Sequence, residues 1–332
     1  MEGWLNGVKI DIIGAGSIGL LLAGKLIHAG YDVRIWCRSR EQSDALRKEG
    51  LTVSYEDGTE PVFVKGTAFT ASAAEAFAET YLREPGEWVA VTLKQQAFHS
   101  ELPDMLKNLA GVRLQAVCFQ NGSGHLEKLR ELLPHASVWA AVTTEAAKRK
   151  TLTEVIHTGR GEVYIGQETA GYTIAETDRQ FPEGAAGSFT DALLAAGFSA
   201  SMSNKVNTLI YRKLLINAVI NPLTAVWRIQ NGELLASDQR VRLMKELYAE
   251  AVAVYDACGI DYEADAWEHI TRVCRATSGN TSSMLADVLA GRRTEIRWIN
   301  GSIVDLAERR GIQVPLHRWI CQLVEGMSAR ER

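Results

Sequence analysis

The chain has 332 residues, 46% of them hydrophobic and 23% charged, and its formal net charge is −4. This length exceeds one typical hydrophobic core, so we expect two domains of ordinary globular composition. The acidic balance argues against a nucleic-acid partner, and five cysteines without a CxxC pair argue against a metal site or a disulfide framework. We find neither a signal peptide nor an apolar run of about 18 residues that could span a membrane, so we expect a cytoplasmic protein with no membrane partner.

The first predicted element is a strand over residues 8–13, which leads into a glycine-rich turn and then a helix. The turn reads Gly14-Ala15-Gly16-Ser17-Ile18-Gly19, and apolar residues at helical spacing follow it. Gly14 permits a tight turn, Gly16 lets the backbone approach a pyrophosphate, and Gly19 lets the helix pack closely on the strand. This context predicts a dinucleotide site at residues 14–19, where the helix N-terminus supplies amide donors.

The residues that follow the second predicted strand, 32–36, bear on which dinucleotide binds. An acidic residue at this point binds the ribose 2′-hydroxyl of NAD, whereas this chain has Arg38, Ser39 and Arg40. Two guanidinium groups and a hydroxyl suit a 2′-phosphate dianion, so the sequence favours NADP(H). The alternative interpretation is that these arginines are merely solvated.

Polar residues also follow later strands of the predicted α/β sheet. A helix over 41–49 and a hairpin over 51–64, which turns at Asp57-Gly58, precede strands over 88–93, 114–119 and 137–142. Lys94 follows the first of these strands and Asn121 follows the second. Ligands of open α/β sheets bind beyond the carboxyl ends of the strands, so both residues are candidate cofactor contacts. Each alone also fits a loop residue that satisfies a turn.

The pattern becomes wholly helical near Ser203, where we place the domain boundary. Before it, residues 155–166 have strand character, 173–196 are predicted as a helix interrupted by Pro182 and Gly184, and 198–202 as a last strand. After it, helices are predicted near 241–258, 265–274, 282–289, 294–310 and 316–327. The sequence thus predicts an α/β Rossmann domain over 1–203 and an all-helical domain over 204–332.

A polar stripe runs through the apolar segment 211–233. Lys213, Asn217 and Asn221 are four residues apart, so on an α-helix they project from one side. A cation and two amides are costly to bury without hydrogen bonds, so we expect something polar to face them. Within the same segment Pro222 removes a backbone donor and frees the carbonyl of Ala218.

Two more polar clusters lie in the helical domain. Residues 280–284 are typical of a helix N-terminus, where a hydroxyl and backbone amides hold a carboxylate, or where Thr281 or Ser282 simply caps the helix. Glu295 is interpreted structurally as a first-turn helix charge or as a partner of Arg292.

Taken together, these motifs resemble the ketopantoate reductase (2-dehydropantoate 2-reductase) family over nearly the whole chain. The matching segments are Gly14 to Gly19, Lys94, Gln120-Asn121-Gly122, Thr143-Thr144, Ala146-Ala147, Arg212-Lys213-Leu214, Asn217, Asn221-Pro222-Leu223-Thr224-Ala225, Asn231-Gly232, Ser282-Ser283-Met284, Thr294-Glu295-Ile296 and Ile299-Asn300-Gly301. The glycine turn occurs in many families, whereas the sequence NPLTA after a helical lysine is specific to this one. The resemblance implies a Rossmann domain joined to a helical domain of the 6-phosphogluconate dehydrogenase C-terminal type, with the site in the cleft between them. It also implies NADPH-dependent reduction of ketopantoate to (R)-pantoate, on the route to pantothenate and coenzyme A.

The resemblance also implies roles for single residues. Lys213 takes the place of the catalytic lysine, and Glu295 that of a glutamate at the junction of cofactor and substrate. The implied substrate contacts are Lys213, Asn217, Asn221, Asn231, Asn280 and Ser283, of which the last two hold the carboxylate. The implied cofactor contacts are Lys94, Asn121, Ala147 and Glu295, in addition to the 14–19 turn and Arg38.

The chemistry of a ketone reduction agrees with these roles. Hydride transfer leaves negative charge on the carbonyl oxygen, which a lysine ammonium can stabilise and protonate. Burial lowers the pKa of such a lysine, while a carboxylate such as Glu295 raises it.

Departures from the family leave the substrate open. Arg297 and Trp298 stand where the family usually has an acidic residue and a tyrosine, which puts a positive charge near the site or its rim, and the 51–64 and 167–190 segments are longer than the family core. A related reductase of another 2-oxo acid is therefore one alternative. A non-catalytic NADP(H)-binding sensor is another, which the presence of both Lys213 and Glu295 disfavours. The sequence does not fix the oligomeric state, for which a homodimer is one option.

Overall fold

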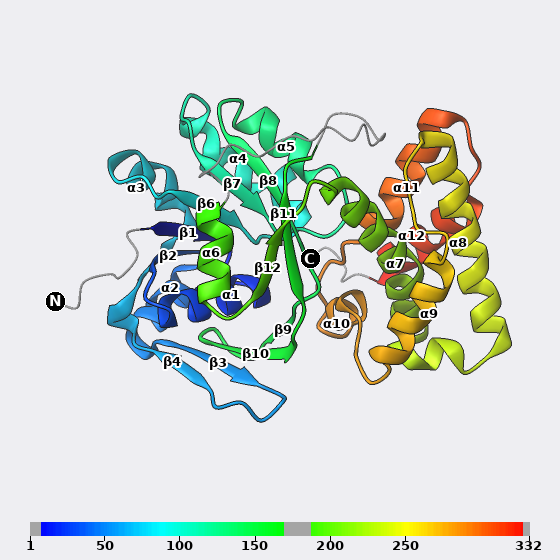
Figure 1. Ribbon diagram of the computed structural model, residues 1–332, viewed down its shortest axis with the longest axis horizontal. Helices are drawn as coiled ribbons and strands as arrows, with labels where there is room; N and C mark the ends of the chain where they lie inside the picture. Colours follow the sequence, from blue (N-terminus) through cyan, green and yellow to red (C-terminus); the bar gives the residue numbers. More distant parts are fainter. Residues whose placement is uncertain (1–7, 169–186, 328–332) are drawn as a thin grey trace. The chain divides into compact units, whose positions relative to one another are not determined.

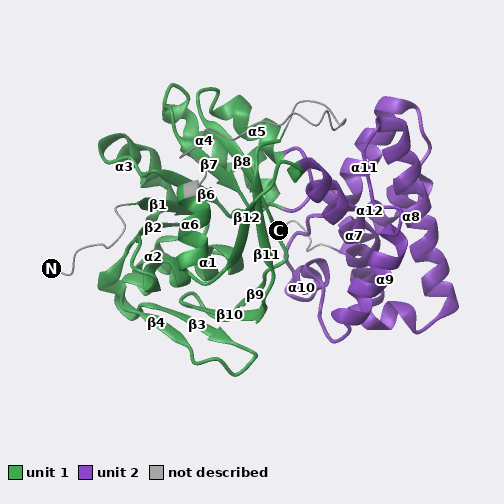
Figure 2. Ribbon diagram, in the orientation of Figure 1, with its two compact units in different colours: residues 1–120, 125–168, 178–206 green, residues 121–124, 169–177, 207–332 purple. Residues whose placement is uncertain are grey.

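The computed structural model describes residues 8–168 and 187–327. Within this part the chain forms two compact units (Figure 2). The first takes in residues 8–120, 125–168 and 187–206, and the second takes in residues 121–124 and 207–327. The sheet lies in the first unit, and the second is helical.

The first unit is built on an eight-stranded sheet with the order β12-β11-β8-β7-β6-β1-β2-β5. The strands are β1 (Lys9–Ile13), β2 (Asp32–Cys37), β5 (Thr70–Ala73), β6 (Trp88–Val91), β7 (Gln115–Cys118), β8 (Ser137–Thr143), β11 (Glu162–Gly166) and β12 (Ser199–Met202). All neighbours are parallel except β8 and β11, which are antiparallel. The order reverses direction at β1, so the end of β1 lies where ligands of such sheets bind.

The strands are apolar along most of their length because both faces of this sheet are covered. Ile10 and Ile12 of β1 belong to the core that includes α1 (Ser17–His28) and Phe189 of α6 (Gly187–Ala195). On the other face, the Trp36 ring packs edge-on against the Phe77 ring of α3 (Phe77–Arg83), and the two ring centroids are 5.3 Å apart. The other helices of the unit are α2 (Arg40–Glu49), α4 (Glu101–Leu106) and α5 (His125–Leu132).

A buried ion pair sits on the second face of the sheet, within the apolar strands. Arg34 Nε and Nη2 of β2 donate to the two carboxylate oxygens of Asp11 of β1 at 2.8 and 2.7 Å, and Trp36 Nε1 donates to Asp11 at 2.7 Å. Burial raises the pKa of Asp11, while Arg34 acts in the opposite direction. The two strands are therefore joined by a charge-assisted contact, which the apolar pattern of their sequences does not predict.

A smaller sheet of order β4-β3-β10-β9 packs beside α1 in the same unit. It consists of β3 (Leu51–Tyr55), β4 (Val62–Val64), β9 (Ala146–Arg149) and β10 (Glu154–Gly159). The hairpin predicted at Asp57-Gly58 is confirmed as the β3–β4 pair, with Gly58 at φ +81°. The parallel pairing of β3 with β10 was not predicted, because it joins segments far apart in the chain.

The second unit consists of α7 (Val206–Trp227), α8 (Asp238–Cys258), α9 (Ala266–Ala276), α10 (Ser283–Leu289), α11 (Ile296–Arg310), α12 (Pro315–Met327) and the 3-10 helix η5 (Asn231–Leu235). Figure 1 shows α7 among α8, α9, α11 and α12. Leu214, Ala218 and Leu223 of α7 share one buried core with residues of every other helix of the unit. The mixed α/β fold with a following helical part, which the sequence predicts, is thus observed.

Some sequence predictions need correction. The helical segment 211–233 ends at Trp227, and Arg228 takes φ +55°, so Asn231 lies beyond α7 in η5. Among the described residues, α7 is also long and apolar enough to cross a membrane by length and composition alone, contrary to our expectation that no segment is. Most of α7 is buried in the core of the unit, which accounts for its apolarity. Most of the helix predicted over 173–196 lies outside the described residues. Within them, α6 corresponds to the end of this predicted helix.

Candidate functional site

The glycine turn joins β1 to α1, as the sequence predicts. Gly14 has φ +110°, and a Cβ there would lie 3.0 Å from the Leu93 backbone nitrogen. A Cβ on Gly19 would lie 1.8 Å from the Gly14 carbonyl oxygen, whereas a Cβ on Gly16 would meet no atom of residues 8–168 and 187–327 within 4 Å. Ala15 is buried, and Ser17 and Ile18 are half-buried. Protein atoms therefore leave no room for a side chain at Gly14 and Gly19. At Gly16, beside the first amides of α1, there is free space for a ligand.

Two residues that the sequence did not single out hold this turn. Gln42, buried in α2, donates from Nε2 to the Ala15 carbonyl at 2.8 Å and to the Leu152 carbonyl at 3.1 Å. The backbone amide of Arg149 donates to Ser17 Oγ at 3.0 Å. The turn, α2 and the β9–β10 hairpin thus meet at one place. The only signal was a glutamine three residues after Ser39, which indicates a capping box rather than this contact.

The residues after β2 offer two exposed cations. Arg38 and Arg40 are exposed, and Arg38 Nε lies 3.9 Å from Glu101 Oε1. Such a long, solvated pair holds the guanidinium weakly, so Arg38 stays accessible to an anion. Ser39 Oγ accepts a hydrogen bond from the Gln42 amide at 3.3 Å and caps α2.

Lys94, Asn121 and Ala147 are all half-buried. Lys94 follows β6 and is the N-terminal cap of the 3-10 helix η3 (Gln95–His99), Asn121 follows β7, and Ala147 lies on β9. Gln120 Nε2 donates to the Val91 carbonyl at 2.9 Å and to the Leu93 carbonyl at 2.8 Å. The side chain next to Asn121 therefore fastens the end of β7 to the loop that carries Lys94.

In the helical unit, Lys213 and Glu295 act on each other. Lys213 is half-buried on α7, and Glu295 is half-buried at the N-terminal cap of α11. Burial lowers the pKa of Lys213 to about 8, and the negative charge of Glu295 acts in the opposite direction. A lysine with a pKa of about 8 is about nine-tenths protonated at pH 7 and can release its proton readily.

The asparagines fall into two groups. Asn217 and Asn221 follow Lys213 at one-turn intervals on α7, the first half-buried and the second buried. Asn231, in η5, donates from its backbone to the Asn280 carbonyl at 3.1 Å and from Nδ2 to Thr277 Oγ1 at 2.9 Å. The structure thus brings Asn231 beside the loop of Asn280.

Thr277 fixes the orientation of the Asn231 amide. Its hydroxyl donates its single hydrogen to the Val273 carbonyl at 2.7 Å, so toward Asn231 it accepts. Asn231 Oδ1 is left buried without a hydrogen-bond partner among the described residues.

The 280–284 cluster begins a helix, as predicted. Ser282 Oγ accepts from the Leu285 amide at 3.1 Å and lies 2.7 Å from Thr224 Oγ1 of α7, so it caps α10 and ties it to α7. Asn280 and Ser283 are exposed. Arg292, which the sequence offered as one partner for Glu295, pairs through Nε with Asp287 Oδ1 at 3.0 Å.

Arg297 is directed along α11, away from Glu295 at its start. Its Nη1 lies 3.0 Å from Asp305 Oδ1 and 3.3 Å from the Gly301 carbonyl, both further along the helix. The positive charge that we expected near the site is therefore paired with Asp305.

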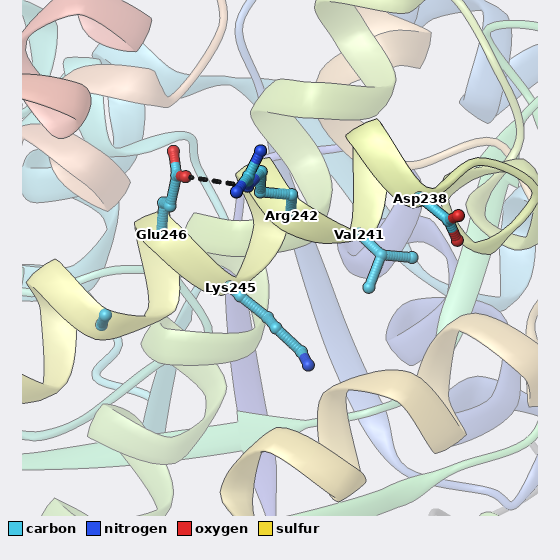
Figure 3. Close-up of a pocket in the computed structure, with 6 residues that line it drawn as sticks. Asp238, Val241, Arg242, Lys245 and Glu246 are labelled. Carbon is cyan, nitrogen blue, oxygen red and sulfur yellow. Dashed lines mark ion pairs between the residues drawn. The ribbon is translucent and has the colours of Figure 1, made fainter.

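A shallow hollow on α8 lies apart from these residues. It is lined by Asp238, Val241, Arg242, Lys245, Glu246 and Ala249, all from that one helix, and none is a predicted site residue (Figure 3). Over residues 8–168 and 187–327, no three histidine, cysteine, aspartate or glutamate residues form a group that could hold a metal ion.

The sheet unit with its glycine turn and the helical unit define a class of proteins with a Rossmann domain followed by a helical domain. Family models match both parts: "Ketopantoate reductase PanE/ApbA" over residues 10–169 and its C-terminal model over residues 205–328. The chain belongs to the ketopantoate reductase family.

Individual relatives agree with this assignment. The chain is 33% identical to a 2-dehydropantoate 2-reductase of Archaeoglobus fulgidus, over 97% of this chain and 98% of the relative. It is 26% identical to a solved PanE/ApbA family ketopantoate reductase of Ralstonia eutropha, with a TM-score of 0.80 over 96% of this chain and 98% of that chain. It also shares its fold with a D-mandelate dehydrogenase solved with NADH, at 21% identity and a TM-score of 0.80, over 96% of this chain and 98% of the other.

Proposed function

We propose that this protein catalyses the NADPH-dependent reduction of 2-dehydropantoate (ketopantoate) to (R)-pantoate, in the cytoplasmic supply of pantothenate and coenzyme A. The observation that carries the proposal is the Lys213–Glu295 pair in a member of the ketopantoate reductase family. The relatives named as 2-dehydropantoate 2-reductases support the choice of substrate.

Lys213 is the proton donor in this proposal. A reduced nicotinamide, when bound, supplies the hydride to the ketone carbon of the substrate. The Lys213 ammonium stabilises the negative charge that develops on the carbonyl oxygen and transfers one proton to it, becoming a neutral amine. Glu295 keeps enough of Lys213 protonated near neutral pH, against the effect of burial.

The amides orient the substrate without adding net charge. Asn217 and Asn221 lie on the Lys213 side of α7, and Asn231 has a buried carbonyl oxygen for which the described part of the chain offers no donor. Because Thr277 fixes this polarity, we assign Asn231 to a substrate hydroxyl, while Asn280 and Ser283 receive the carboxylate.

NADPH is the cofactor that the first unit suits best. The opening at Gly16 leaves room for a pyrophosphate at the first amides of α1, with Lys94 and Ala147 of the same unit as further contacts. Asn121, which belongs to the second unit, is a further proposed contact. Arg38, which is exposed and weakly paired, provides a charge for the 2′-phosphate.

The direct test follows NADPH absorbance with purified protein and ketopantoate. We expect turnover with ketopantoate and, at equal concentration, far less with NADH. A much higher kcat/KM for another 2-oxo acid, such as 2-oxoisovalerate, would overturn the substrate assignment. Comparable efficiency with NADH would overturn the cofactor assignment alone.

A further inference from the structure

A row of hydrogen bonds between uncharged groups inside the helical unit joins four of its helices. Asn300 of α11 and His317 of α12 are 0% exposed. Asn300 Nδ2 lies 2.8 Å from the Ala218 carbonyl oxygen of α7 and 3.1 Å from His317 Nδ1. His317 Nε2 lies 3.0 Å from the Leu247 carbonyl oxygen of α8. Neither Asn300 nor His317 was a predicted site residue.

The two backbone carbonyls at the ends of this row determine the direction of every bond. A carbonyl only accepts, so His317 Nε2 carries the hydrogen and Nδ1 of the neutral ring accepts. Asn300 therefore presents its NH₂ group, with one hydrogen for His317 and the other for Ala218. Burial lowers the pKa of His317 to about 4, which keeps the ring neutral at physiological pH, and the bond to the Leu247 carbonyl acts in the opposite direction.

Pro222 explains why α7 needs a donor from another helix. It lies inside α7 and has no N–H, so the Ala218 carbonyl four residues earlier loses its helical partner. Ala218 is completely buried, and a buried carbonyl without a hydrogen bond destabilises the fold. Asn300 supplies the missing hydrogen bond.

The same two helices carry the pair on which the proposed function rests. Lys213 precedes Ala218 by five residues on α7, and Glu295 precedes Asn300 by five residues at the start of α11. The Asn300 bond therefore lies about 7.5 Å along each helix from the pair. A change in the separation of α7 and α11 at Ala218 changes the distance between Lys213 and Glu295.

We propose that Asn300 and His317 are positioning residues, which hold Lys213 against Glu295 by satisfying the carbonyl that Pro222 leaves open. The inference rests on the proposed role of Lys213 as the proton donor. Asn300 acts through the backbone of α7, and His317 acts by orienting the Asn300 amide, because both side chains are completely buried and their hydrogen bonds go to the backbone and to each other.

The charged groups around this arrangement define what a pH profile reports. Glu295 is the carboxylate that acts on Lys213. Arg212, the next residue in the chain, is directed to Glu263 at 3.1 Å and to His269 at 3.0 Å. On the other side, the Glu250 carboxylate accepts from the backbone amides of Leu316 and His317 at 3.0 and 3.1 Å. If α7 and α11 separate, Glu295 raises the pKa of Lys213 less, so that pKa falls.

The test compares Asn300→Ala, Pro222→Ala and the double variant, with Ser302→Ala as the matched control. Ser302 also lies on α11 and is buried, but among the described residues its hydroxyl bonds only to the Trp298 and Ile299 carbonyls of its own helix. We expect Asn300→Ala to lower kcat about tenfold to hundredfold and to shift its alkaline limb to lower pH. Ser302→Ala should leave the alkaline limb in place.

The double variant tests the role of Pro222. Alanine at position 222 restores the N–H that serves the Ala218 carbonyl, so Asn300→Ala in this background should change kcat less than about threefold. Equal losses in both backgrounds would overturn the proposal, as would a loss of stability by Asn300→Ala with an unchanged pH profile. If Asn300→Ala does not fold alone, folding of the double variant supports the proposal, and failure of both contradicts it.

A second measurement separates this inference from the proposed activity. The titration of Lys213, followed by ¹³C NMR in lysine-labelled protein, needs no turnover. If the wild-type protein does not reduce ketopantoate, the proposed function fails. If the Lys213 pKa is the same in Asn300→Ala as in wild type, the positioning role fails.

Discussion

The glycine turn and the α7 stripe prepare their sites by opposite means. At Gly16 of the turn there is no side chain, and the backbone itself is what a ligand would meet. In α7, the side chains of Lys213, Asn217 and Asn221 carry the chemistry, and Pro222 has removed a backbone bond beneath them. A site made of backbone depends on local geometry, whereas a site made of side chains in a core depends on partners elsewhere in the unit.

Removing the charged end of the stripe tests the α7 side of this comparison most severely. We expect Lys213→Ala to lower kcat about 10²-fold to 10⁴-fold, because both charge stabilisation and proton donation are lost. NADPH affinity, measured by fluorescence titration, should not change. Lys205→Ala, which removes an exposed lysine just before α7, serves as the control. Wild-type turnover in Lys213→Ala would exclude the lysine from the chemistry.

The pH dependence of kcat should report the same side chain. Only protonated Lys213 can donate, and its pKa is about 8, so kcat should fall as the pH rises above about 8. Glu295→Gln removes the charge that raises this pKa, so the fall should begin at lower pH. Steady-state rates from pH 6 to 10 measure both profiles. An alkaline limb that does not move in Glu295→Gln would contradict the coupling.

Two glycine substitutions separate packing from binding in the turn. Gly19→Ala places a Cβ 1.8 Å from a backbone oxygen, so the free energy of unfolding should fall by at least about 1–3 kcal/mol. The methyl group of Gly16→Ala meets no atom of the described residues within 4 Å, so this variant should keep its thermal stability while its dinucleotide affinity falls. Calorimetry and fluorescence titration distinguish the two. An unchanged NADPH affinity in Gly16→Ala would show that the pyrophosphate does not lie close to residue 16.

Arg38→Ala sharpens the comparison at the cofactor. We expect NADPH affinity to fall about tenfold, the effect of one charge-assisted contact, and NADH affinity to stay within about twofold. Arg47→Ala, which removes an exposed arginine of α2 paired with Asp44, is the matched control. Equal losses for both dinucleotides would remove Arg38 from the 2′-phosphate site.

Arg297→Ala should have the smallest effect. Its guanidinium pairs with Asp305 further along α11, so kcat/KM for ketopantoate should change less than about threefold. A large change in the ratio of rates between ketopantoate and 2-oxoisovalerate would return this arginine to the substrate site.

The sequence alone predicted the turn and most elements well, because their signals are local. Gly14, Gly16 and Gly19 stand in a strand–turn–helix context, and α8, α9 and α11 begin and end within a few residues of their predicted bounds. Long-range pairing was not predictable: β3 with β10, or Gln42 with Ala15, joins residues whose local patterns do not refer to each other.

In the helical unit the stripe was visible, but its support was not. Asn300 appeared only as part of a family motif, and His317 did not appear at all. Pro222 was the usable signal, because a proline inside a buried helix requires that another group satisfy the freed carbonyl. Pro222 therefore predicts that a hydrogen-bond donor faces Ala218, but it does not predict which residue provides it.

The Asp11–Arg34 ion pair in the main sheet also disfavours a shifted alignment of β1 and β2. The two residues face each other directly across β1 and β2. If the strands slipped by one residue, each charge would be buried opposite an apolar side chain, at a cost of several kcal/mol per ion. The Gly14 amide bonds to the Trp36 carbonyl only in the correct alignment. This pair therefore favours the strand alignment in which the glycine turn and the Arg38 segment leave the sheet side by side.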